Sequence, residues 1–295
     1  MKLNKPPAIS FSSKIAELSK LNILSLVLVA TFLGFYLGSN GEIEYSKLFL
    51  TLIGTAFTAA GSGSLNHYLE RDADKKMDRT RNRPLPSGTL TPLFAVLYGM
   101  AFVVIGSIML AYFVNLLTGF LSLLTSFLYI VVYTPLKKIT WLNTSIGSIP
   151  GAIPIIGGWT AASNNISPMA LVLFGIMYLW QHPHFYAIAW LCKNDYAKAN
   201  FKMLPVIEES GSRTMRQIFW HLLLMIPLSF LPVIQGNLGI IYLVGVTIIT
   251  FIFFLSALPL AKDRSNKSAL LLLKASVLYL PVLLFIIIID KGLGS

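Results

Sequence analysis

Four oxygen-bearing side chains recur at intervals of four residues in one stretch of the sequence. They are Asn66, Glu70, Asp74 and Asp78. Four residues advance an α-helix by about 400°, so these side chains share one slowly drifting face of a helix. Carboxylates on one face repel one another unless a cation lies among them, and an oxygen-only set suits Mg²⁺. The spacing therefore predicts a magnesium site.

Three arginines, Arg79, Arg81 and Arg83, follow these acids directly. A guanidinium group binds phosphate through two parallel hydrogen bonds. Acids and bases in near balance are also typical of a solvated helix end, so the stretch alone leaves both interpretations open. Because an apolar segment precedes it, we favour a site for Mg²⁺ and diphosphate at a membrane surface.

A second polar group interrupts an apolar segment at Gln181, His182 and His184. Polar and ionisable residues at membrane depth are costly and usually mark a functional site. A histidine pair satisfied by backbone carbonyls is the alternative, and we favour the functional interpretation. Pro183 is expected to disturb the helix between the two histidines. His221 has no polar companions in the sequence, and we interpret it as structural.

Composition places the chain in a membrane. Of its 295 residues, 55% are hydrophobic and only 12% are charged, whereas a soluble domain is nearer a quarter charged. The net charge of +11 is then the cationic flank of a membrane protein, and we expect no nucleic-acid partner. The single cysteine, Cys192, excludes a disulfide within the chain.

Nine apolar runs approach the roughly 20 residues that a helix needs to cross a bilayer. They are Leu21–Gly38, Leu48–Leu65, Leu93–Phe113, Leu116–Tyr133, Ser145–Ala162, Met169–Trp190, Ile218–Ile234, Leu238–Leu260 and Ala269–Ile289. The first run lacks a cleavage site for a signal peptide, so we expect it to be retained. The sequence predicts an all-α, polytopic membrane protein: a bundle of nine transmembrane helices around a central cavity open to the cytoplasmic face.

The charges of the connecting segments predict the orientation. With a cytoplasmic N-terminal segment (1–20), nearly all lysines and arginines fall on the cytoplasmic side; Lys47 and Lys291 fall outside, and Lys274 lies inside the ninth run. This asymmetry follows the positive-inside rule and puts the C-terminus outside. The long loops within 66–92 and 181–217 then share the cytoplasmic face of a single domain, 21–290. Their arrangement hints at two related halves, although no clean sequence repeat is visible.

The fifth run is rich in glycine and proline, with Pro150-Gly151, Pro154 and Gly157-Gly158. Small residues permit close approach of helices, and prolines in a span need neighbours that satisfy the freed carbonyls. The run is therefore either a tightly packed, kinked helix or a wall that makes room for a bulky, flat ligand. The sequence does not separate these two interpretations.

The first polar stretch resembles the first aspartate-rich motif of the UbiA-type membrane prenyltransferases. That motif has Asn followed by acids at four-residue spacing and then Arg-Thr-x-Asn-Arg-Pro-Leu, which Asn66, Glu70, Asp74 and residues 79–85 match. Within the superfamily the chain is similar to the haem O synthase family over about residues 15–290. The supporting segments are 133–138, 143–159, Trp180–Phe185, Asp195–Tyr196 and Met203–Pro205. Two departures are Glu70 in place of a common Asp, and a second motif that offers Asp195 alone.

The resemblance implies transfer of the farnesyl group of farnesyl diphosphate to a vinyl group of haem b (protohaem IX), with addition of water, in the plasma membrane. It implies Mg²⁺ held by Glu70, Asp74, Asn66 and Asp195, with Arg79 and Arg83 stabilising the departing diphosphate. It also implies that His182 or His184 holds the haem iron or a propionate. The remaining candidate substrate-binding residues are Asp78, Lys137, Lys138 and Tyr196.

Three alternatives remain at this point. The first is a UbiA-type enzyme that prenylates an aromatic acceptor such as a hydroxybenzoate or naphthoate. The second is a transporter of divalent cations or lipids, although transporters place their sites near the bilayer midplane and these acids lie at one face. The third is a non-catalytic scaffold for haem delivery. The sequence also leaves open whether a downstream haem-modifying enzyme or terminal oxidase binds this surface.

Overall fold

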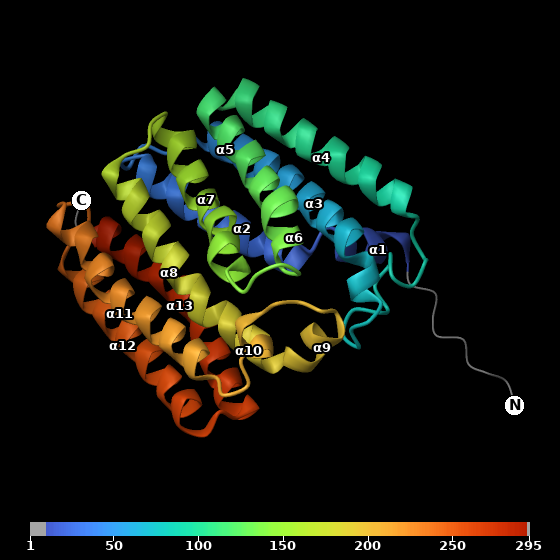
Figure 1. Cartoon of the computed structure of the whole chain (residues 1–295). Coiled ribbons are helices and arrows are strands. Elements are labelled where there is room, and N and C mark those ends of the chain that lie inside the picture. The colour runs from blue at the N-terminus through green and yellow to red at the C-terminus, as the bar shows by residue number, and fades with distance from the viewer. Residues whose placement is uncertain (1–9, 294–295) are drawn as a thin grey trace, which may run out of the picture.

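The computed structural model describes residues 10–293, and every regular element in that range is helical (Figure 1). The first nine residues of the predicted cytoplasmic segment lie outside the described range. The remainder of that segment contains a short helix, α1 (Phe11–Leu18), which packs against α3 and buries Leu18 completely. This helix is absent from the sequence-based prediction.

A long helix follows each of the nine predicted runs. These helices are α2 (Leu21–Gly38), α3 (Tyr45–Asp74), α4 (Pro92–Phe113), α5 (Leu116–Phe127) with its continuation, α7 (Asn143–Ser163), α8 (Pro168–Leu191), α11 (Ser212–Ile234), α12 (Ile240–Asp263) and α13 (Asn266–Leu293). Among the described residues, seven of them have both the length and the mean hydropathy of a membrane span. The protein is therefore a multi-pass membrane protein. The two that fall short are α7 and α8, which carry the glycines, prolines and polar residues noted above, so the count of nine stays a prediction.

The helices form one bundle. The α4 helix packs on α3 and α5. On the other side, α11 and α13 pack on α8, and α12 packs on α11 and α13. Figure 1 shows α4 on one flank and α12 on the opposite flank. The largest apolar core lies on the α8 side and contains fully buried Tyr186, Tyr242 and Phe253. The space between the two flanks is bordered by α2, α3, α5, α7 and α8.

Glycines bring α2 and α7 into backbone contact. A Cβ atom added to Gly34 would lie 1.9 Å from the carbonyl oxygen of Ile155, and one added to Gly158 would lie 1.9 Å from that of Thr31. At neighbouring Gly157, by contrast, an added Cβ would meet nothing within 4 Å. Both interpretations of the fifth run therefore hold, each for a different face of α7: one face packs closely and the other leaves space.

A π-helical turn, η1 (Leu128–Tyr133), joins α5 to the short α6 (Thr134–Leu136). The Thr134 hydroxyl donates to the carbonyl of Tyr129 at 2.8 Å, which ties the wide turn together. Such turns inside helices are frequent at functional sites. Here the wide turn places Tyr129 and Tyr133 on the same side of the helix, facing the interior of the bundle.

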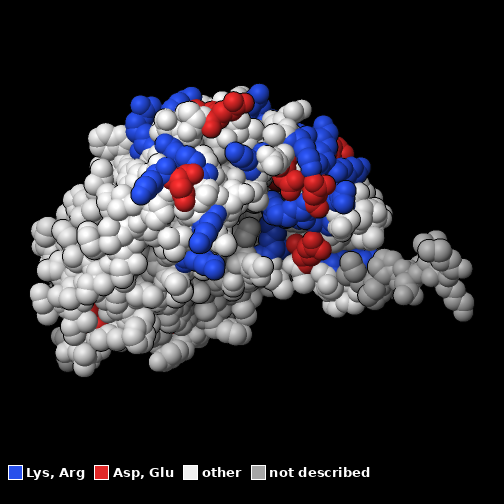
Figure 2. All heavy atoms as spheres, turned by 90° about the horizontal axis from the view of Figure 1, so that it is seen from below, with Lys and Arg blue, Asp and Glu red and all other residues white. Residues whose placement is uncertain are grey.

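The two long loops meet at one end of the bundle, as predicted. The loop after α8 contains α9 (Lys193–Lys198) and α10 (Leu204–Ile207) and packs on the loop after α3 through Met77, Phe201 and Met203. Figure 2 views the molecule from this end. Lys and Arg side chains gather there with a few acids, around a hollow in the surface.

Candidate active site

An elongated chamber of about 430 Å³ opens between the two loops and extends into the bundle. Charged side chains line its mouth, whereas hydroxyl-bearing and apolar side chains line its depth. The charged group at the mouth consists of Lys20, Glu70, Asp74, Arg79, Arg83 and Lys137. Lys20 directly precedes α2, Glu70 and Asp74 lie on α3, Arg79 and Arg83 lie in the loop after α3, and Lys137 directly follows α6, so folding assembles the mouth from distant parts of the sequence.

The two acids nearest the chamber are buried and each is paired with a base. Glu70 is 6% exposed and lies 2.7 Å from the ammonium group of Lys137. Asp74 is 1% exposed and lies 3.2 Å from the guanidinium group of Arg83. A buried charge is stable only when it is paired or hydrogen-bonded. Burial disfavours the charge of Lys137, but Glu70 outweighs it and holds the pKa of Lys137 well above its usual range.

The predicted stripe of four oxygen ligands ends at its third member. Asn66, Glu70 and Asp74 lie on α3, but the helix stops at Asp74, where the Thr80 hydroxyl donates to the backbone carbonyl of that residue. Asp78 therefore lies beyond the helix, exposed, where it pairs with Lys198 of the other loop. Its placement on the same helical face was wrong, because the chain turns before completing the fourth interval.

Lys20 completes the mouth and was not predicted. It adopts a left-handed backbone conformation, with φ of 51°, just before α2, and its ammonium group donates to the amide oxygen of Asn66. The amide nitrogen of Asn66 donates in turn to the Thr134 hydroxyl at 2.8 Å. Burial lowers the pKa of Lys20 to about 7. The only sequence signal was a lysine immediately before the first apolar run, which resembles any membrane flank.

The loop after α8 contributes three lining residues, Tyr196, Phe201 and Met203, and one residue, Asp195, that holds the two loops together. Tyr196 lines the chamber, and burial raises its pKa to about 12. Asp195 instead accepts hydrogen bonds from the backbone N–H groups of Asp78 and Arg79, at 3.3 and 3.2 Å. Asp195 thus joins the two loops. Lys138 is exposed and does not line the chamber.

The predicted histidine pair divides between two environments. His182 is fully buried and away from the chamber; its ring nitrogens contact the Tyr178 carbonyl at 2.9 Å and the Ser145 hydroxyl at 3.1 Å. Its ring also stacks on that of His221, with centroids 3.6 Å apart. Contrary to its predicted substrate-binding role, His182 is therefore not among the residues that line the chamber, and His221 has the partner that its sequence neighbours did not reveal. The α8 helix runs through Pro183 without a break, so two residues that are two positions apart lie on different faces of the helix. Of the pair, His184 lines the chamber and His182 does not.

Two tyrosines face the space just inside the mouth. The rings of Tyr129 and Tyr133 stack with centroids 5.6 Å apart, and both line the chamber. The Lys137 ammonium group lies 4.7 Å from the Tyr133 ring centroid. The negative face of an aromatic ring attracts a cation. This pair can therefore stabilise positive charge at the entrance of the apolar part, a feature that sequence spacing alone did not indicate.

The donor chemistry of the mouth fits Mg²⁺ better than a softer metal. Among residues 10–293, no three histidine, cysteine, aspartate or glutamate side chains gather closely enough to hold a metal ion alone. Two carboxylates, Glu70 and Asp74, are nevertheless at hand, and Mg²⁺ usually binds one or two carboxylates and takes its other ligands from water and phosphate. The residues present therefore suit a magnesium ion that arrives with a phosphate group.

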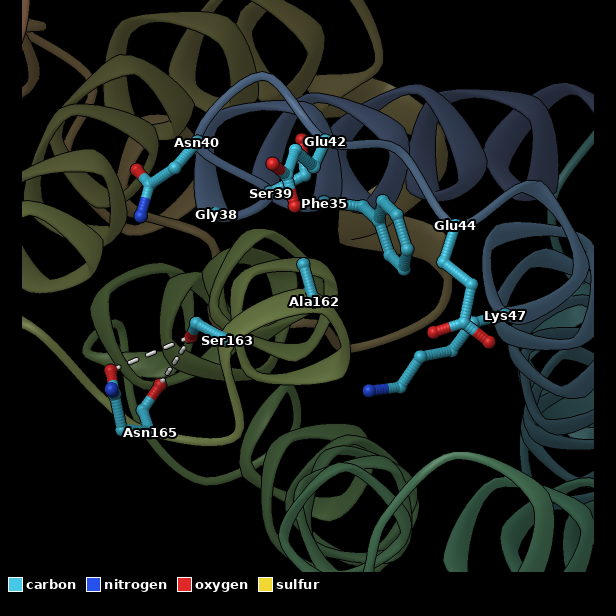
Figure 3. A pocket seen from close by; sticks show the side chains of 10 residues that line it. All are labelled: Phe35, Gly38, Ser39, Asn40, Glu42, Glu44, Lys47, Ala162, Ser163 and Asn165. Atoms are coloured by element: carbon cyan, nitrogen blue, oxygen red, sulfur yellow. Dashed lines mark hydrogen bonds between the residues drawn. The ribbon is translucent and has the colours of Figure 1, made fainter.

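A second hollow, of about 540 Å³, lies at the opposite ends of α2 and α7 (Figure 3). Of its charged lining residues, Glu42 and Glu44 are exposed and Lys47 is half-buried. Figure 3 shows Ser163 hydrogen-bonded to Asn165 at its edge. None of the predicted site residues lies there, so the chamber between the two loops is the candidate active site.

An all-helical membrane protein with a charged mouth above an apolar chamber is built to bind a substrate with an anionic head and an apolar tail. The UbiA prenyltransferase family model matches residues 27–279. The chain belongs to the UbiA prenyltransferase family and is a membrane prenyltransferase.

Known proteins of high similarity share one description. The chain is 39% identical to the protoheme IX farnesyltransferase of Solibacter usitatus, over 93% of this chain and 97% of that protein. It is 41% identical to the protein of that name from Salinibacter ruber, over 92% and 96% of the two chains. The mitochondrial protoheme IX farnesyltransferase of Arabidopsis thaliana is 38% identical, over 90% of this chain and 62% of that one.

Solved structures share the fold at lower sequence identity. A digeranylgeranylglyceryl phosphate synthase matches with a TM-score of 0.79 at 19% identity, over 95% of this chain and 98% of that one. A UbiA homologue from Archaeoglobus fulgidus bound to GPP and Mg²⁺ matches with a TM-score of 0.66 at 17% identity, over 93% and 99%. These similarities establish the helical architecture.

Proposed function

We propose that this chain transfers the farnesyl group of farnesyl diphosphate to a vinyl group of haem b, with addition of water, to give haem O and diphosphate. The observation that carries the proposal is the chamber: two buried acids and several bases surround its mouth, and His184 is the histidine among the described residues that line it. The farnesyltransferase relatives named above support the choice of donor and acceptor.

The charged mouth binds the diphosphate. Arg79, Arg83 and Lys137 line it, and Lys20 lies beside them. When the bond between farnesyl C1 and the diphosphate oxygen breaks, its electron pair leaves with the diphosphate. Preorganised cations stabilise that growing negative charge, and the water-poor setting strengthens the effect. We assign Arg79, Arg83 and Lys137 to this role, together with Lys20 in its protonated form.

Glu70 and Asp74 would hold the metal, in keeping with the Mg²⁺-bound UbiA homologue. Bound there, Mg²⁺ would act as a Lewis acid on the diphosphate oxygens. Asn66 accepts a hydrogen bond from Lys20 through its amide oxygen and can position that ammonium group, and it remains a proposed third oxygen ligand of the metal. Asp195 remains a proposed ligand, directly or through water, from its place between the loops.

The chamber protects the carbon chemistry. Departure of diphosphate leaves an allylic cation, which Tyr129 and Tyr133 face with their rings. The π electrons of the haem vinyl group form the new carbon–carbon bond to C1. The cation this leaves on the vinyl carbon next to the macrocycle takes up a water oxygen, and that water releases a proton. The product is a hydroxyethylfarnesyl side chain.

We also propose that residues 21–290 form one prenyltransferase domain in the plasma membrane, with the loop end in the cytoplasm. The gathering of Lys and Arg at that end supports this orientation, because cytoplasmic segments carry the excess of basic residues (Figure 2).

The test is a turnover assay with purified protein, haem b and farnesyl diphosphate, with Mg²⁺ or with a chelator, read by mass. A Mg²⁺-dependent gain of a hydroxyethylfarnesyl group supports the proposal. Prenylation of an added aromatic acid instead of haem would refute the acceptor. Asp74→Ala should abolish turnover, whereas the matched control Asp72→Ala, which changes a carboxylate 68% exposed on the same helix, should retain it.

A further inference from the structure

One serine of α13 joins the chamber histidine to the rest of the bundle. The hydroxyl group of Ser276 lies 2.8 Å from Nδ1 of His184 and 2.6 Å from the carbonyl oxygen of Leu273. Ser276 is fully buried, so no solvent competes for these contacts. The contact crosses from α13 to α8 and connects residues 92 positions apart in the sequence.

The protons of this group can be assigned from hydrogen-bond chemistry. A serine hydroxyl has a single proton, and a carbonyl oxygen can only accept. The Ser276 proton therefore lies on the bond to Leu273, and the serine oxygen must accept from His184. This makes His184 the Nδ1–H tautomer, whose Nε2 carries a lone pair. Nε2 makes no hydrogen bond to any residue that the structure describes, and the side chain lines the chamber.

The same serine also fixes the ring that lies against the histidine. The indole N–H of Trp180 donates to the backbone carbonyl of Ser276 at 2.9 Å. The Trp180 ring stacks on the His184 ring, with centroids 5.0 Å apart and an interplanar angle of 20°. Ser276 thus controls the proton of His184 through its hydroxyl and the plane of that imidazole through the neighbouring indole.

We propose that Ser276 is a positioning residue that holds His184 with Nε2 free to bind the iron of the acceptor haem. This inference rests on the proposed function, because it takes haem as the acceptor. A neutral imidazole nitrogen with its lone pair directed into an apolar site is a common axial ligand of haem iron. A hydrogen bond on the opposite ring nitrogen fixes the tautomer and orientation of such ligands.

His182 differs from His184 because it has no free ring nitrogen with which to bind a ligand. Both of its ring nitrogens already contact protein groups, the Tyr178 carbonyl and the Ser145 hydroxyl. Of the two histidines of this segment, only His184 therefore offers a free nitrogen to a ligand in the chamber.

The tautomer can be measured without haem. In protein labelled with ¹⁵N-histidine, NMR distinguishes a protonated from an unprotonated ring nitrogen, and His184→Gln identifies the signals of His184 among the four histidines. We expect Nδ1–H in the native protein and a mixture of tautomers in Ser276→Ala. An Nε2–H tautomer in the native protein would overturn the proposal.

Haem binding is measured separately, by titrating haem b without farnesyl diphosphate and recording the absorption and electron paramagnetic resonance spectra. Ser276→Ala should weaken haem affinity by about tenfold or more, as is usual when the partner of a metal-binding histidine is removed. His184→Ala should lose the nitrogen-ligand signature, and added imidazole should restore it.

Ser256→Ala is the matched control. Ser256 is also buried, and its hydroxyl donates to the carbonyl three residues earlier at 2.7 Å, but it makes no hydrogen bond to a histidine among the described residues. The haem affinity of this variant should therefore not change. An altered tautomer with unchanged haem affinity in Ser276→Ala would refute the positioning role. Native protein that shows the Nδ1–H tautomer but binds no haem would refute the proposed acceptor and leave the tautomer assignment standing.

Discussion

Gly157 is the position at which the chamber should discriminate between isoprenoid chains of different length. Lining residues follow one face of α7 from Gly147, which contacts the Tyr133 ring near the mouth, to Gly157 in the depth. Ten residues separate the two glycines, which is roughly 15 Å along a helix. A farnesyl chain extends about 13 Å and a geranyl chain about 8 Å, at the roughly 1.2 Å per bond of an extended backbone.

The terminal isoprene unit of a farnesyl group that starts beside Tyr133 would therefore lie near Gly157, whereas a geranyl group would end well short of it. Replacing Gly157 by leucine fills this space. Because an added Cβ would meet nothing within 4 Å, the fold should accept the change. Five carbons at about 0.8 kcal/mol each give about 4 kcal/mol of lost burial, or up to roughly 10³-fold in affinity.

The assay measures competition of farnesyl and geranyl diphosphate for the site in Gly157→Ala, Gly157→Val and Gly157→Leu. Farnesyl affinity should fall stepwise along the series while geranyl affinity stays within a few-fold, so geranyl diphosphate serves as the control for intact diphosphate binding. An equal loss for both donors would refute the reasoning, because it would indicate a distorted mouth. Unchanged farnesyl binding in Gly157→Leu would show that the tail does not reach this depth.

Three further predictions concern charge. Asp74→Asn should lower kcat by about 10²-fold or more, because the variant loses one of the two carboxylates proposed to hold the magnesium ion that would neutralise the departing diphosphate; near-native steady-state kinetics would contradict this. Asp290→Ala removes the acceptor of the N–H groups of Gly239 and Tyr242 at the start of α12 and should cost about 1–3 kcal/mol in thermal unfolding, with farnesyl diphosphate affinity unchanged. Partial burial tends to raise the pKa of Glu208, but hydrogen bonds from Ser210 and from the start of α11 hold that pKa below its ordinary value. The ionised Glu208 side chain therefore stabilises the fold above about pH 4.5. This stabilisation disappears as the pH falls through the lower pKa of the folded state. Glu208→Gln should therefore reduce the melting temperature more at pH 7 than at pH 3.5, and an equal difference at both pH values would contradict this capping role.

Apolar runs and charge asymmetry predicted the long helices and the end at which the loops meet, because burial in lipid constrains composition strongly. The spacing of Glu70 and Asp74 likewise predicted that they share a helical face, since both lie on one helix that continues past the apolar run. Asp78 was misplaced because spacing alone does not reveal where a helix stops. The stop depends on Thr80 and on contacts with the other loop, which are tertiary.

The two histidines also show what sequence spacing could not predict. His182 and His184 are two residues apart on one helix and point in different directions, so adjacency in sequence could not assign both to the chamber. Lys20 and Tyr129 were missed for the opposite reason. Each has an ordinary sequence setting, a basic flank and an apolar helix, and only the packing of α2 and η1 beside α3 brings them to the mouth.

The pairing of Glu70 with Lys137 and of Asp74 with Arg83 has a consequence for the order of events on the enzyme. With each acid already compensated, a lone divalent ion would have to displace an ammonium or guanidinium group and strand it without a counterion. Magnesium that arrived together with the diphosphate ester would avoid that conflict, because Glu70 and Asp74 would hold the metal while the diphosphate would neutralise the displaced cations. Free Mg²⁺ should therefore bind the protein poorly. Mg²⁺ should raise the affinity for the diphosphate ester, and the ester should raise the affinity for Mg²⁺ by the same factor.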